Sequence, residues 1–239
     1  MAGMSAQLRK LVLLPGLDGT GRLFATLRAS LGGTFRTEVV RFPTSRSMSD
    51  SELLSLVRSS CPTNEAFVIV AESFSSPLAI QYAATKPSQL RGLVICAGFA
   101  SNPLQGMLRF ACPLLSPLLF SVSPPPAFAL RLMLVGGSAP RSLVAEVQDA
   151  ISSVEQPVLR ARLNSVLECD ARSALAQIDI PMLYIQASHD RLVNPRSLNE
   201  IRRSKPDVQF ASVRGPHLIL QREPRKCAEI IATFVDLLA

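Results

Sequence analysis

Phe67-Val68-Ile69-Val70-Ala71-Glu72-Ser73-Phe74-Ser75-Ser76 is the stretch that decides the fold of this chain. Its first five residues form a continuous apolar run, which predicts a strand buried on both faces of a sheet. A helical pattern begins at once and ends before Pro87. Ser73 therefore lies on the turn between a buried strand and a helix. Small residues, Ala71 and Ser75, stand two positions before and after it, as a sharp strand-to-helix turn requires.

Ser73 has two interpretations at this point. A serine at the start of a helix is commonly an N-cap, whose hydroxyl accepts a backbone hydrogen bond. The same position is that of the nucleophile in a G-x-S-x-G elbow, where a strained turn exposes the serine hydroxyl. Both glycines of that pattern are replaced here, so the rest of the chain has to decide between the two.

Outward from this stretch, short apolar runs alternate with helical patterns. Further strands are predicted at Leu11–Leu14, Val39–Arg41, Leu93–Cys96, Met182–Gln186 and Val208–Val213. Helices are predicted after the capping sequence Ser49-Asp50-Ser51-Glu52, from near Pro195, and over about Arg225 to Leu238. Continuous apolar strands that alternate with helices indicate a doubly wound α/β fold. We expect a six-stranded, parallel sheet with helices on both faces.

One region breaks the alternation. Between Ser101 and about Leu175 no strand is evident, prolines are dense, and the segments between them are short and Leu-rich. A connection of this length is too long for a simple loop. We therefore expect residues 1–100 and 179–239 to form the core and residues 101–178 to form a helical cap over the strand ends, where ligand crevices open. The alternative is a plain pair of packing helices.

The chain has only two histidines, so a serine hydrolase would have to use His189 or His217 as its base. His217 follows the last predicted strand, and Asp190 follows the strand before it. Ser73, Asp190 and His217 thus stand at the carboxyl ends of three strands, in the order serine, acid, base. His189 is disfavoured because Asp190, its neighbour in sequence, cannot readily orient its ring. We predict Ser73 as nucleophile, Asp190 as acid and His217 as base.

A glycine-rich loop, Leu14-Pro15-Gly16-Leu17-Asp18-Gly19-Thr20-Gly21, follows the first strand. It lacks the lysine of a phosphate-binding P-loop. We expect the backbone N–H groups of Leu17 and Phe74 to form an oxyanion hole, each contributing roughly 3 kcal/mol to the stabilisation of a tetrahedral intermediate. Gly16, Leu17 and Phe74 are the predicted substrate-binding residues.

From Leu11 to Leu238 the chain resembles the α/β-hydrolase superfamily. Its C-terminal third resembles pimeloyl-acyl carrier protein methyl ester carboxylesterases and related small esterases, through Asp170-Ala171-Arg172, Ile180-Pro181-Met182-Leu183-Tyr184-Ile185 and His189-Asp190-Arg191-Leu192-Val193-Asn194-Pro195. The glycine-rich loop and the elbow look like the esterase, lipase and acyltransferase group that includes plastid phytyl ester synthases. The resemblance implies the α/β-hydrolase fold and the same triad. Pro15 departs from it, because many members have histidine there.

The amino-acid composition restricts the kinds of partner that the protein can bind. The chain is 48% hydrophobic and 18% charged, which supplies a core and excludes disorder. Its net charge of +7 comes mostly from scattered arginines without interleaved aromatics, which argues against nucleic-acid binding. The most basic stretch, Arg191 to Lys226, is interpreted as a solvated face, with an acidic macromolecular partner as the alternative.

The compartment is predicted from cysteines and apolar runs. The five cysteines show no metal-ligand or CxxC spacing, which favours a reducing environment. The apolar segment from Leu104 to Phe120 is interrupted by Arg109, Pro113 and Pro117 and is too short for a membrane span. The N-terminus carries no signal-peptide pattern. We expect a cytoplasmic protein without a membrane span.

The predicted function is hydrolysis of a carboxylic ester through an acyl-enzyme, with no metal or organic cofactor. An apolar acyl pocket is expected from the cap residues Leu104, Met107, Leu108, Phe110, Leu114, Leu115, Leu118, Leu119 and Phe120. The substrate is a small-molecule ester or one bound to an acyl carrier protein, which Arg141, Arg160 and Arg162 would meet. Two alternatives stay open: transfer of the acyl group to an acceptor other than water, and a non-catalytic binding protein on the same fold.

Overall fold

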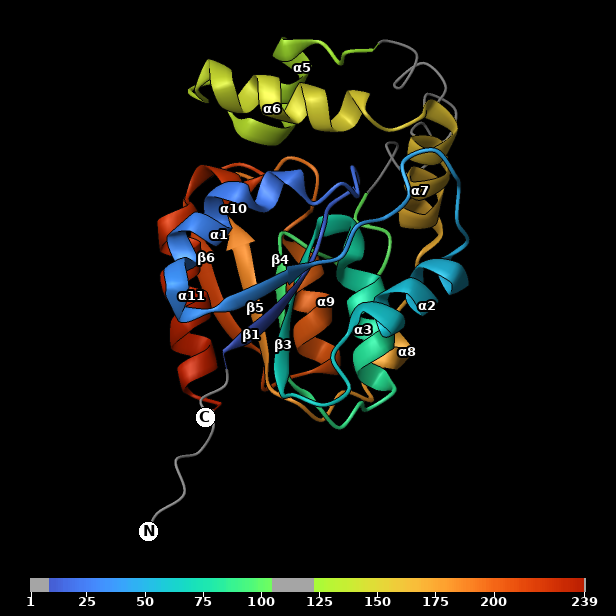
Figure 1. The fold of residues 1–239 in the computed structure, drawn as a ribbon, viewed down its shortest axis with the longest axis vertical. Coiled ribbons are helices and arrows are strands. Elements are labelled where there is room, and N and C mark those ends of the chain that lie inside the picture. Colours follow the sequence, from blue (N-terminus) through green and yellow to red (C-terminus); the bar gives the residue numbers. More distant parts are fainter. Residues whose placement is uncertain (1–8, 105–122, 239) are drawn as a thin grey trace.

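The computed structural model describes residues 9–104 and 123–238 and contains one six-stranded sheet (Figure 1). The strand order is β2-β1-β3-β4-β5-β6, and every neighbouring pair is parallel. The strands are β1 (Lys10–Leu14), β2 (Arg36–Val39), β3 (Phe67–Glu72), β4 (Leu90–Cys96), β5 (Met182–Ala187) and β6 (Gln209–Val213). The predicted six-stranded parallel sheet is confirmed.

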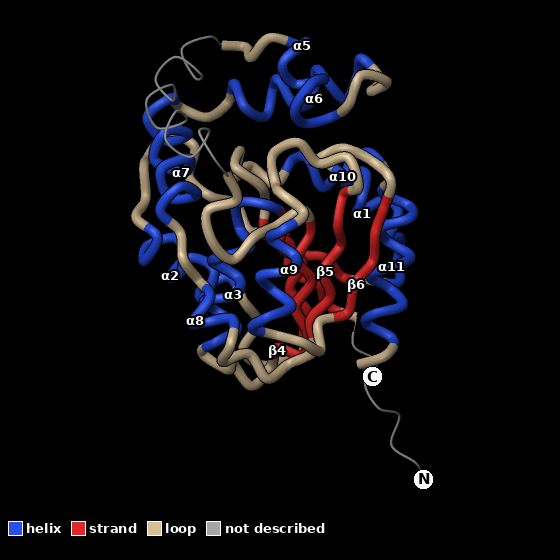
Figure 2. The backbone as a smooth tube through the Cα atoms, turned by 180° about the vertical axis from the view of Figure 1, so that it is seen from behind, coloured by secondary structure: helices blue, strands red, loops and turns tan. Residues whose placement is uncertain are grey.

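Helices cover both faces of this sheet (Figures 1 and 2). One face carries α1 (Ala25–Leu31), α10 (Ile219–Arg222) and α11 (Pro224–Asp236). The other carries α2 (Asp50–Ser60), α3 (Ser76–Ala84), α8 (Arg172–Leu175) and α9 (Arg196–Ser204). Short 3-10 turns are η1 (Arg22–Phe24), η2 (Gly32–Thr34) and η3 (Ser73–Ser75). The helices predicted after Ser49, after the elbow, near Pro195 and at the C-terminus are all present.

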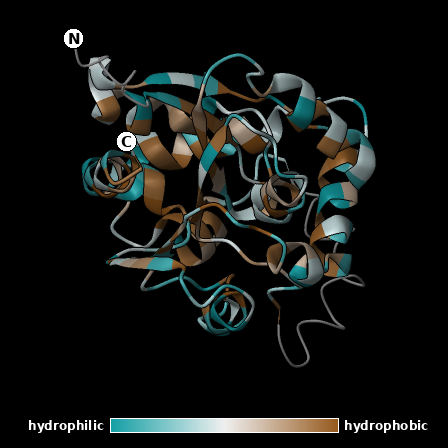
Figure 3. Ribbon diagram, turned by 90° about the horizontal axis from the view of Figure 1, so that it is seen from below, coloured by the Kyte–Doolittle hydropathy of each residue, from teal (hydrophilic) through white to brown (hydrophobic). Residues whose placement is uncertain are grey.

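The sheet separates two hydrophobic cores because side chains alternate between the faces of a strand. In β1, Leu11 and Leu13 join one core with α1 and α11, whereas Val12 and Leu14 join the other with α2, α3 and α9. All six residues of β3 are buried. Figure 3 shows the result, with hydrophobic residues along the central strands and hydrophilic residues outward on the surrounding helices.

The structure differs from the predicted elements in one strand and one helix. The strand expected at Val39–Arg41 is instead β2 at Arg36–Val39, because the edge strand pairs on one side only and needs no apolar run: Lys10 pairs with Arg36 and Leu13 with Val39. Helix α1 was not predicted. Leu27 and Leu31, which it buries, stand four residues apart and carry the signal that was missed.

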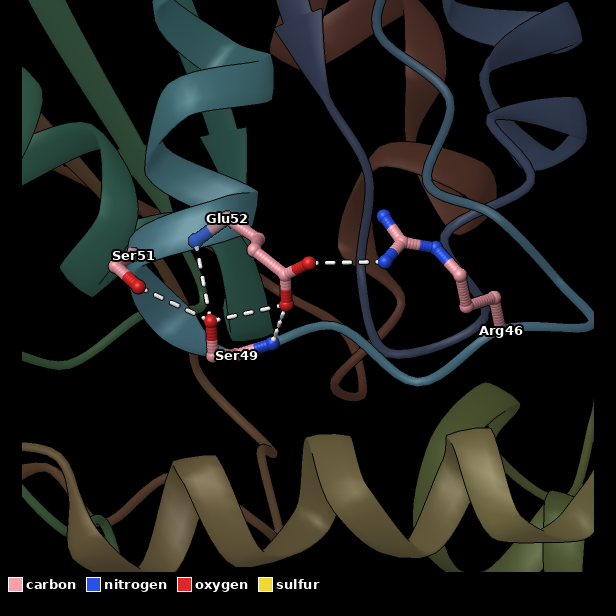
Figure 4. A network of polar contacts seen from close by, with 4 residues as sticks. All are labelled: Arg46, Ser49, Ser51 and Glu52. Carbon is pink, nitrogen blue, oxygen red and sulfur yellow. Dashed lines mark hydrogen bonds and ion pairs between the residues drawn. The ribbon is translucent and has the colours of Figure 1, made fainter.

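Helix α2 begins with a complete capping box, as its sequence predicts (Figure 4). The Ser49 hydroxyl accepts a hydrogen bond from the Glu52 amide at 3.3 Å, and the Glu52 carboxylate accepts one from the Ser49 amide at 2.8 Å. Arg46 holds the other carboxylate oxygen at 2.9 Å. These bonds fix the end of the long loop between β2 and α2, which lies against the glycine-rich loop.

A group of helices lies beyond the carboxyl ends of the strands (Figure 1). It comprises α5 (Ala127–Leu130), the π-helical turn η4 (Arg131–Val135), α6 (Arg141–Ser152) and α7 (Gln156–Glu168). The buried side chains of α5, η4 and α6 share a core with Leu23 and Leu218, whereas Val158 and Leu159 of α7 form a smaller cluster with Val154. Of the apolar cap residues named above, only Leu104 is described; the others, from Met107 to Phe120, lie outside the described residues. None of the described helices is long and apolar enough to cross a bilayer.

Candidate active site

Ser73 stands directly after β3 in a left-handed backbone conformation, with φ of 46°. An L-residue rarely adopts this conformation, and such strain is typical of functional turns. The turn is held by its neighbour Ser75, which is fully buried and donates a hydrogen bond from its hydroxyl to the Pro15 carbonyl. The serine that replaces the second elbow glycine therefore ties the elbow to the glycine-rich loop.

The structure brings Ser73, His217 and Asp190 into one hydrogen-bonded chain. The Nε2 atom of His217 lies 2.9 Å from the Ser73 Oγ, and its Nδ1 lies 2.7 Å from the Asp190 Oδ2. These side chains come from the loops after β3, β6 and β5, as the sequence predicts. His217 is only 3% exposed. A serine, an imidazole and a carboxylate in this order can carry out nucleophilic catalysis.

The acid is held by its own loop, and it governs the base. The Asp190 Oδ1 accepts hydrogen bonds from the Leu192 and Val193 amides at 2.8 and 2.9 Å, which leaves Oδ2 for the imidazole. Burial alone would lower the pKa of His217. The charge of Asp190, its hydrogen bond and the charge of Glu72 outweigh burial, so the pKa of His217 is raised above its ordinary value. The charged form of His217 is therefore stabilised at this position.

His189 is not part of the hydrogen-bonded chain formed by Ser73, His217 and Asp190. Its side chain is exposed, and its Nδ1 is 3.4 Å from the Ser188 hydroxyl. Its amide donates to the Gly215 carbonyl at 2.9 Å, which joins the loop after β5 to the loop after β6. The loop that carries Asp190 is thereby tied to the one that carries His217.

The glycine-rich loop turns tightly between Gly16 and Gly19, whose amide donates to the Gly16 carbonyl at 3.0 Å. Asp18 accepts from the Thr20 amide at 2.9 Å. Within the described parts of the chain the Leu17 amide donates no hydrogen bond. Phe74 follows Ser73 on η3 and is buried, with its ring edge-on to Phe42 at 6.0 Å.

Arg162 on α7 holds this loop, and sequence reasoning assigned it wrongly to the surface. It is 3% exposed. Its Nη1 donates to the carbonyls of Leu17 and Asp18 at 2.9 and 2.7 Å, and its Nη2 donates to the Pro43 carbonyl at 2.8 Å. Burial lowers the pKa of Arg162 to about 10, against the charge of Asp18, so it stays charged at neutral pH. It is not available to a protein partner.

Gly19 makes this arrangement possible. Its φ is +69°, and a Cβ there would lie 2.4 Å from the Arg162 Nη1. Any larger residue would both strain the backbone and displace the guanidinium. The glycine in this position of the loop therefore has a structural reason that the sequence alone does not reveal.

Glu72 is a second residue that sequence reasoning missed. It precedes Ser73 in the sequence and is buried. Its Oε2 accepts a hydrogen bond from the side-chain amide nitrogen of Gln221 at 3.3 Å. Its Oε1 is buried and has no hydrogen-bond partner among the described residues. Burial, and then the charge of Asp18, raises the pKa of Glu72 to about 7. Asp18, whose own pKa is raised by burial, thus forms with Glu72 a pair of buried acids beneath the loop.

Solved structures share this architecture. An esterase from Thermogutta terrifontis matches with a TM-score of 0.81 at 17% identity, over 96% of this chain and 90% of its own. An enol-lactonase from Burkholderia xenovorans matches with 0.79 at 13% identity, over 95% and 91%. A lipase-esterase related protein from Clostridium acetobutylicum matches with 0.78 at 16% identity, over 95% and 94%. The chain therefore has the α/β-hydrolase fold.

The sequence itself gives no such match: no protein-family model and no curated protein matches it. At these identities the structural likeness establishes the fold, and the chemistry has to be argued from the site. Among the described residues, no group of three or more His, Cys, Asp or Glu side chains is placed to hold a metal ion.

Proposed function

We propose that this protein is a serine hydrolase of carboxylic esters, with Ser73 as nucleophile, His217 as base and Asp190 as the acid that orients it. The observation that carries the proposal is the unbroken hydrogen-bonded chain from Ser73 through His217 to Asp190, with Ser73 on a strained turn. The names of the structural neighbours, which include esterases, support the same class of reaction.

In the first step, the Ser73 Oγ attacks the ester carbonyl carbon while His217 Nε2 takes its proton. Asp190 keeps the other ring nitrogen protonated and stabilises the imidazolium. The N–H groups of Leu17 and Phe74 receive the charge that develops on the carbonyl oxygen, each worth roughly 3 kcal/mol in the transition state. His217 then protonates the alcohol as it leaves.

In the second step, water attacks the acyl-enzyme. His217 removes a proton from the water, the tetrahedral intermediate forms again in the same oxyanion hole, and Ser73 leaves with the proton from His217. No external group is needed to balance this sequence, because the proton taken in each half is returned within that half.

The test is hydrolysis of p-nitrophenyl esters from acetate to laurate by the wild type and by Ser73→Ala. We expect the alanine variant to lose turnover by at least a thousandfold, because the nucleophile is gone, while thermal unfolding stays nearly unchanged. Ser59→Ala, which removes an exposed hydroxyl on α2, is the matched control and should keep full activity. Turnover retained by Ser73→Ala would overturn the assignment.

The preferred chain length in the same series measures the acyl pocket that the Leu-rich segment is expected to form. If the well-folded wild type hydrolyses no ester of the series, transfer of the acyl group to an acceptor other than water becomes the favoured reaction. Adding a long-chain alcohol and looking for a new ester tests this alternative. No bond formation in either assay would favour a binding protein.

A narrower substrate is an ester of a pimeloyl chain on an acyl carrier protein. Of the three arginines expected to meet such a carrier, Arg141 is exposed and Arg162 is buried, so Arg162 is no part of a docking surface. Growth complementation of a biotin-requiring strain that lacks its esterase tests this substrate. Failure of well-expressed protein to restore growth would exclude it.

We also propose that the protein works in a reducing compartment such as the cytoplasm. The four cysteines in the described segments, Cys61, Cys96, Cys169 and Cys227, are all free thiols. Burial raises the pKa of Cys61 to about 11 and those of Cys169 and Cys227 to about 12, which makes them poor nucleophiles. Reporter fusions that locate the protein in living cells test this placement.

A further inference from the structure

A basic groove opens beside the triad, on the outer side of the loops after β5 and β6. Its volume is about 720 Å³, which suits a ligand of small-molecule size. Four arginines line it: Arg131, Arg191, Arg214 and Arg222. Among the residues that the structure describes, Glu223 is the only acid in the lining. The stretch that the sequence suggested to be a solvated basic face thus contributes three of its arginines to a concave surface.

The charges of these arginines are not neutralised. Among the described residues none of the four forms an ion pair. Arg131 donates to the Gly137 and Ala139 carbonyls at 2.9 and 2.7 Å, and Arg191 lies 3.4 Å from the Leu132 carbonyl. These partners are neutral oxygens. Gathering four guanidinium groups with a single carboxylate, Glu223, costs electrostatic free energy, which an anion in the groove would recover.

Arg222 gives an independent indication. Its Nη2 is 3.2 Å from the Ser138 hydroxyl, whereas its Nε is buried and has no hydrogen-bond partner within the described chain. Because this Nε is buried, the donors left for an anion in the groove are Nη1 and Nη2, whose only acceptors among the described residues are the uncharged Ser138 oxygens at 3.5 and 3.2 Å. Arginine presents its donors in a planar fork that matches phosphate oxygens, so a phosphate group would suit these side chains.

The rim and the position of the groove indicate what kind of ligand would bear the anionic group. Phe128 and Leu132 are 74% and 53% exposed, and both line the groove, so an apolar part of a ligand has a surface to contact. His189 and Arg191 flank Asp190 in sequence, and Pro216 precedes His217, so the groove is formed in part by the two loops that carry Asp190 and His217.

We propose that this groove binds the phosphate group of the ester substrate, so that the enzyme selects esters with a phosphorylated end over neutral ones. The inference rests on the proposed esterase function for its meaning in catalysis, but the binding site can be tested without turnover. The phosphate belongs either to a soluble phosphorylated ester or to a lipid headgroup.

Calorimetric titration of the full chain with inorganic pyrophosphate is the first test. We expect saturable binding that weakens as salt rises and that is at least tenfold weaker in the double variant Arg191→Ser/Arg214→Ser. Both arginines are exposed, so the fold should survive, and thermal unfolding checks this. The control is Arg58→Ser/Arg203→Ser, which removes the same charge from exposed positions on α2 and α9.

Absence of binding both to pyrophosphate and to vesicles of an anionic phospholipid would overturn the proposal. Equal weakening in both double variants would also overturn it, because attraction would then depend on net charge alone. Sedimentation with phosphatidylglycerol vesicles, against phosphatidylcholine vesicles, separates the two sources. Groove-dependent binding to the vesicles but not to pyrophosphate assigns the phosphate to a lipid, and the reverse result assigns it to a soluble ester.

The last test compares the turnover of two esters. The ratio of kcat/KM for an acyl ester of a phosphorylated alcohol to that for the same ester of the free alcohol should fall at least tenfold in Arg191→Ser/Arg214→Ser. An unchanged ratio contradicts the inference. If the wild type hydrolyses neither ester yet binds pyrophosphate in the groove, the esterase proposal fails and the binding site stands.

Discussion

The two parts of the candidate active site are positioned in different ways. Ser73, His217 and Asp190 each stand where a strand of one sheet ends, so the parallel strands themselves bring the three side chains together. The glycine-rich loop also follows a strand, but its shape depends on Arg162, which is 145 residues further along the chain than Leu17.

This difference separates what the sheet determines from what the inserted helices determine. The triad would keep its geometry as long as the strands keep their register. The loop that carries the Leu17 amide would lose two hydrogen bonds if α7 moved away, and the neighbouring loop between β2 and α2 would lose a third. Substitutions in the two parts should therefore have different signatures: a purely chemical effect in the triad, and a joint effect on catalysis and stability at Arg162.

The largest effect is expected from Asp190→Asn. The amide keeps the contacts with the Leu192 and Val193 amides but no longer stabilises the imidazolium, and kcat should fall about 10⁴-fold. The pKa of His217 should also fall, because the Asp190 charge raises it. Activity requires neutral His217, so it is lost as pH falls through this pKa, and the acid limb of the kcat/KM profile should move to lower pH.

A pH series with Asp190→Asn, the wild type and Asp149→Asn checks this. The last variant removes an exposed carboxylate from α6 and should leave the profile in place. An acid limb that stays at the wild-type pH in Asp190→Asn would show that another group governs it.

The next effect is expected from Arg162→Met. It leaves the buried Asp18 carbonyl and the partly buried Leu17 and Pro43 carbonyls without this donor, and the free energy of unfolding should fall by about 3 kcal/mol. If Arg162 positions the oxyanion loop, kcat should fall at least tenfold with little change in KM, because the oxyanion forms only in the transition state.

Denaturant unfolding and ester kinetics on the same protein measure both quantities, and Arg141→Met, an exposed arginine of α6, is the control. Arg162→Lys keeps the charge but not the fork and should recover only part of each loss. Loss of stability with an unchanged kcat would make Arg162 a packing residue only.

The sequence was sufficient to place Ser73, Asp190 and His217 at one edge of the sheet, because they follow strands and strands are visible as apolar runs. The position of Arg162 was predicted wrongly, since arginine is usually exposed and its acceptors are backbone carbonyls far away in sequence. A signal was present: Val158 and Val166 stand four residues before and after it, so it lies on the buried stripe of α7. The basic groove escaped notice for a similar reason, because its arginines come from four separate segments.

Glu72 gives the smallest of these effects and tests the buried surroundings of the nucleophile. Its pKa is about 7 in the folded protein and 4.5 ordinarily, so between these values the folded state holds a proton that the unfolded state has lost. Stability therefore falls as pH rises through this window, and the loss, on the order of 3 kcal/mol, is complete above it. Glu72→Gln removes the ionisable group, and should be more stable than the wild type at pH values above the window and similar to it below pH 4.5.

Urea unfolding of both proteins on the two sides of the window measures the difference, with Glu146→Gln, an exposed glutamate of α6, as control. The charge of Glu72 also raises the pKa of His217, so the acid limb of Glu72→Gln should move slightly to lower pH. A stability difference that is equal at both pH values would mean that the substitution acts through packing and not through the proton. In that case the charge of the Glu72 carboxylate would not influence the protonation of the residues around Ser73.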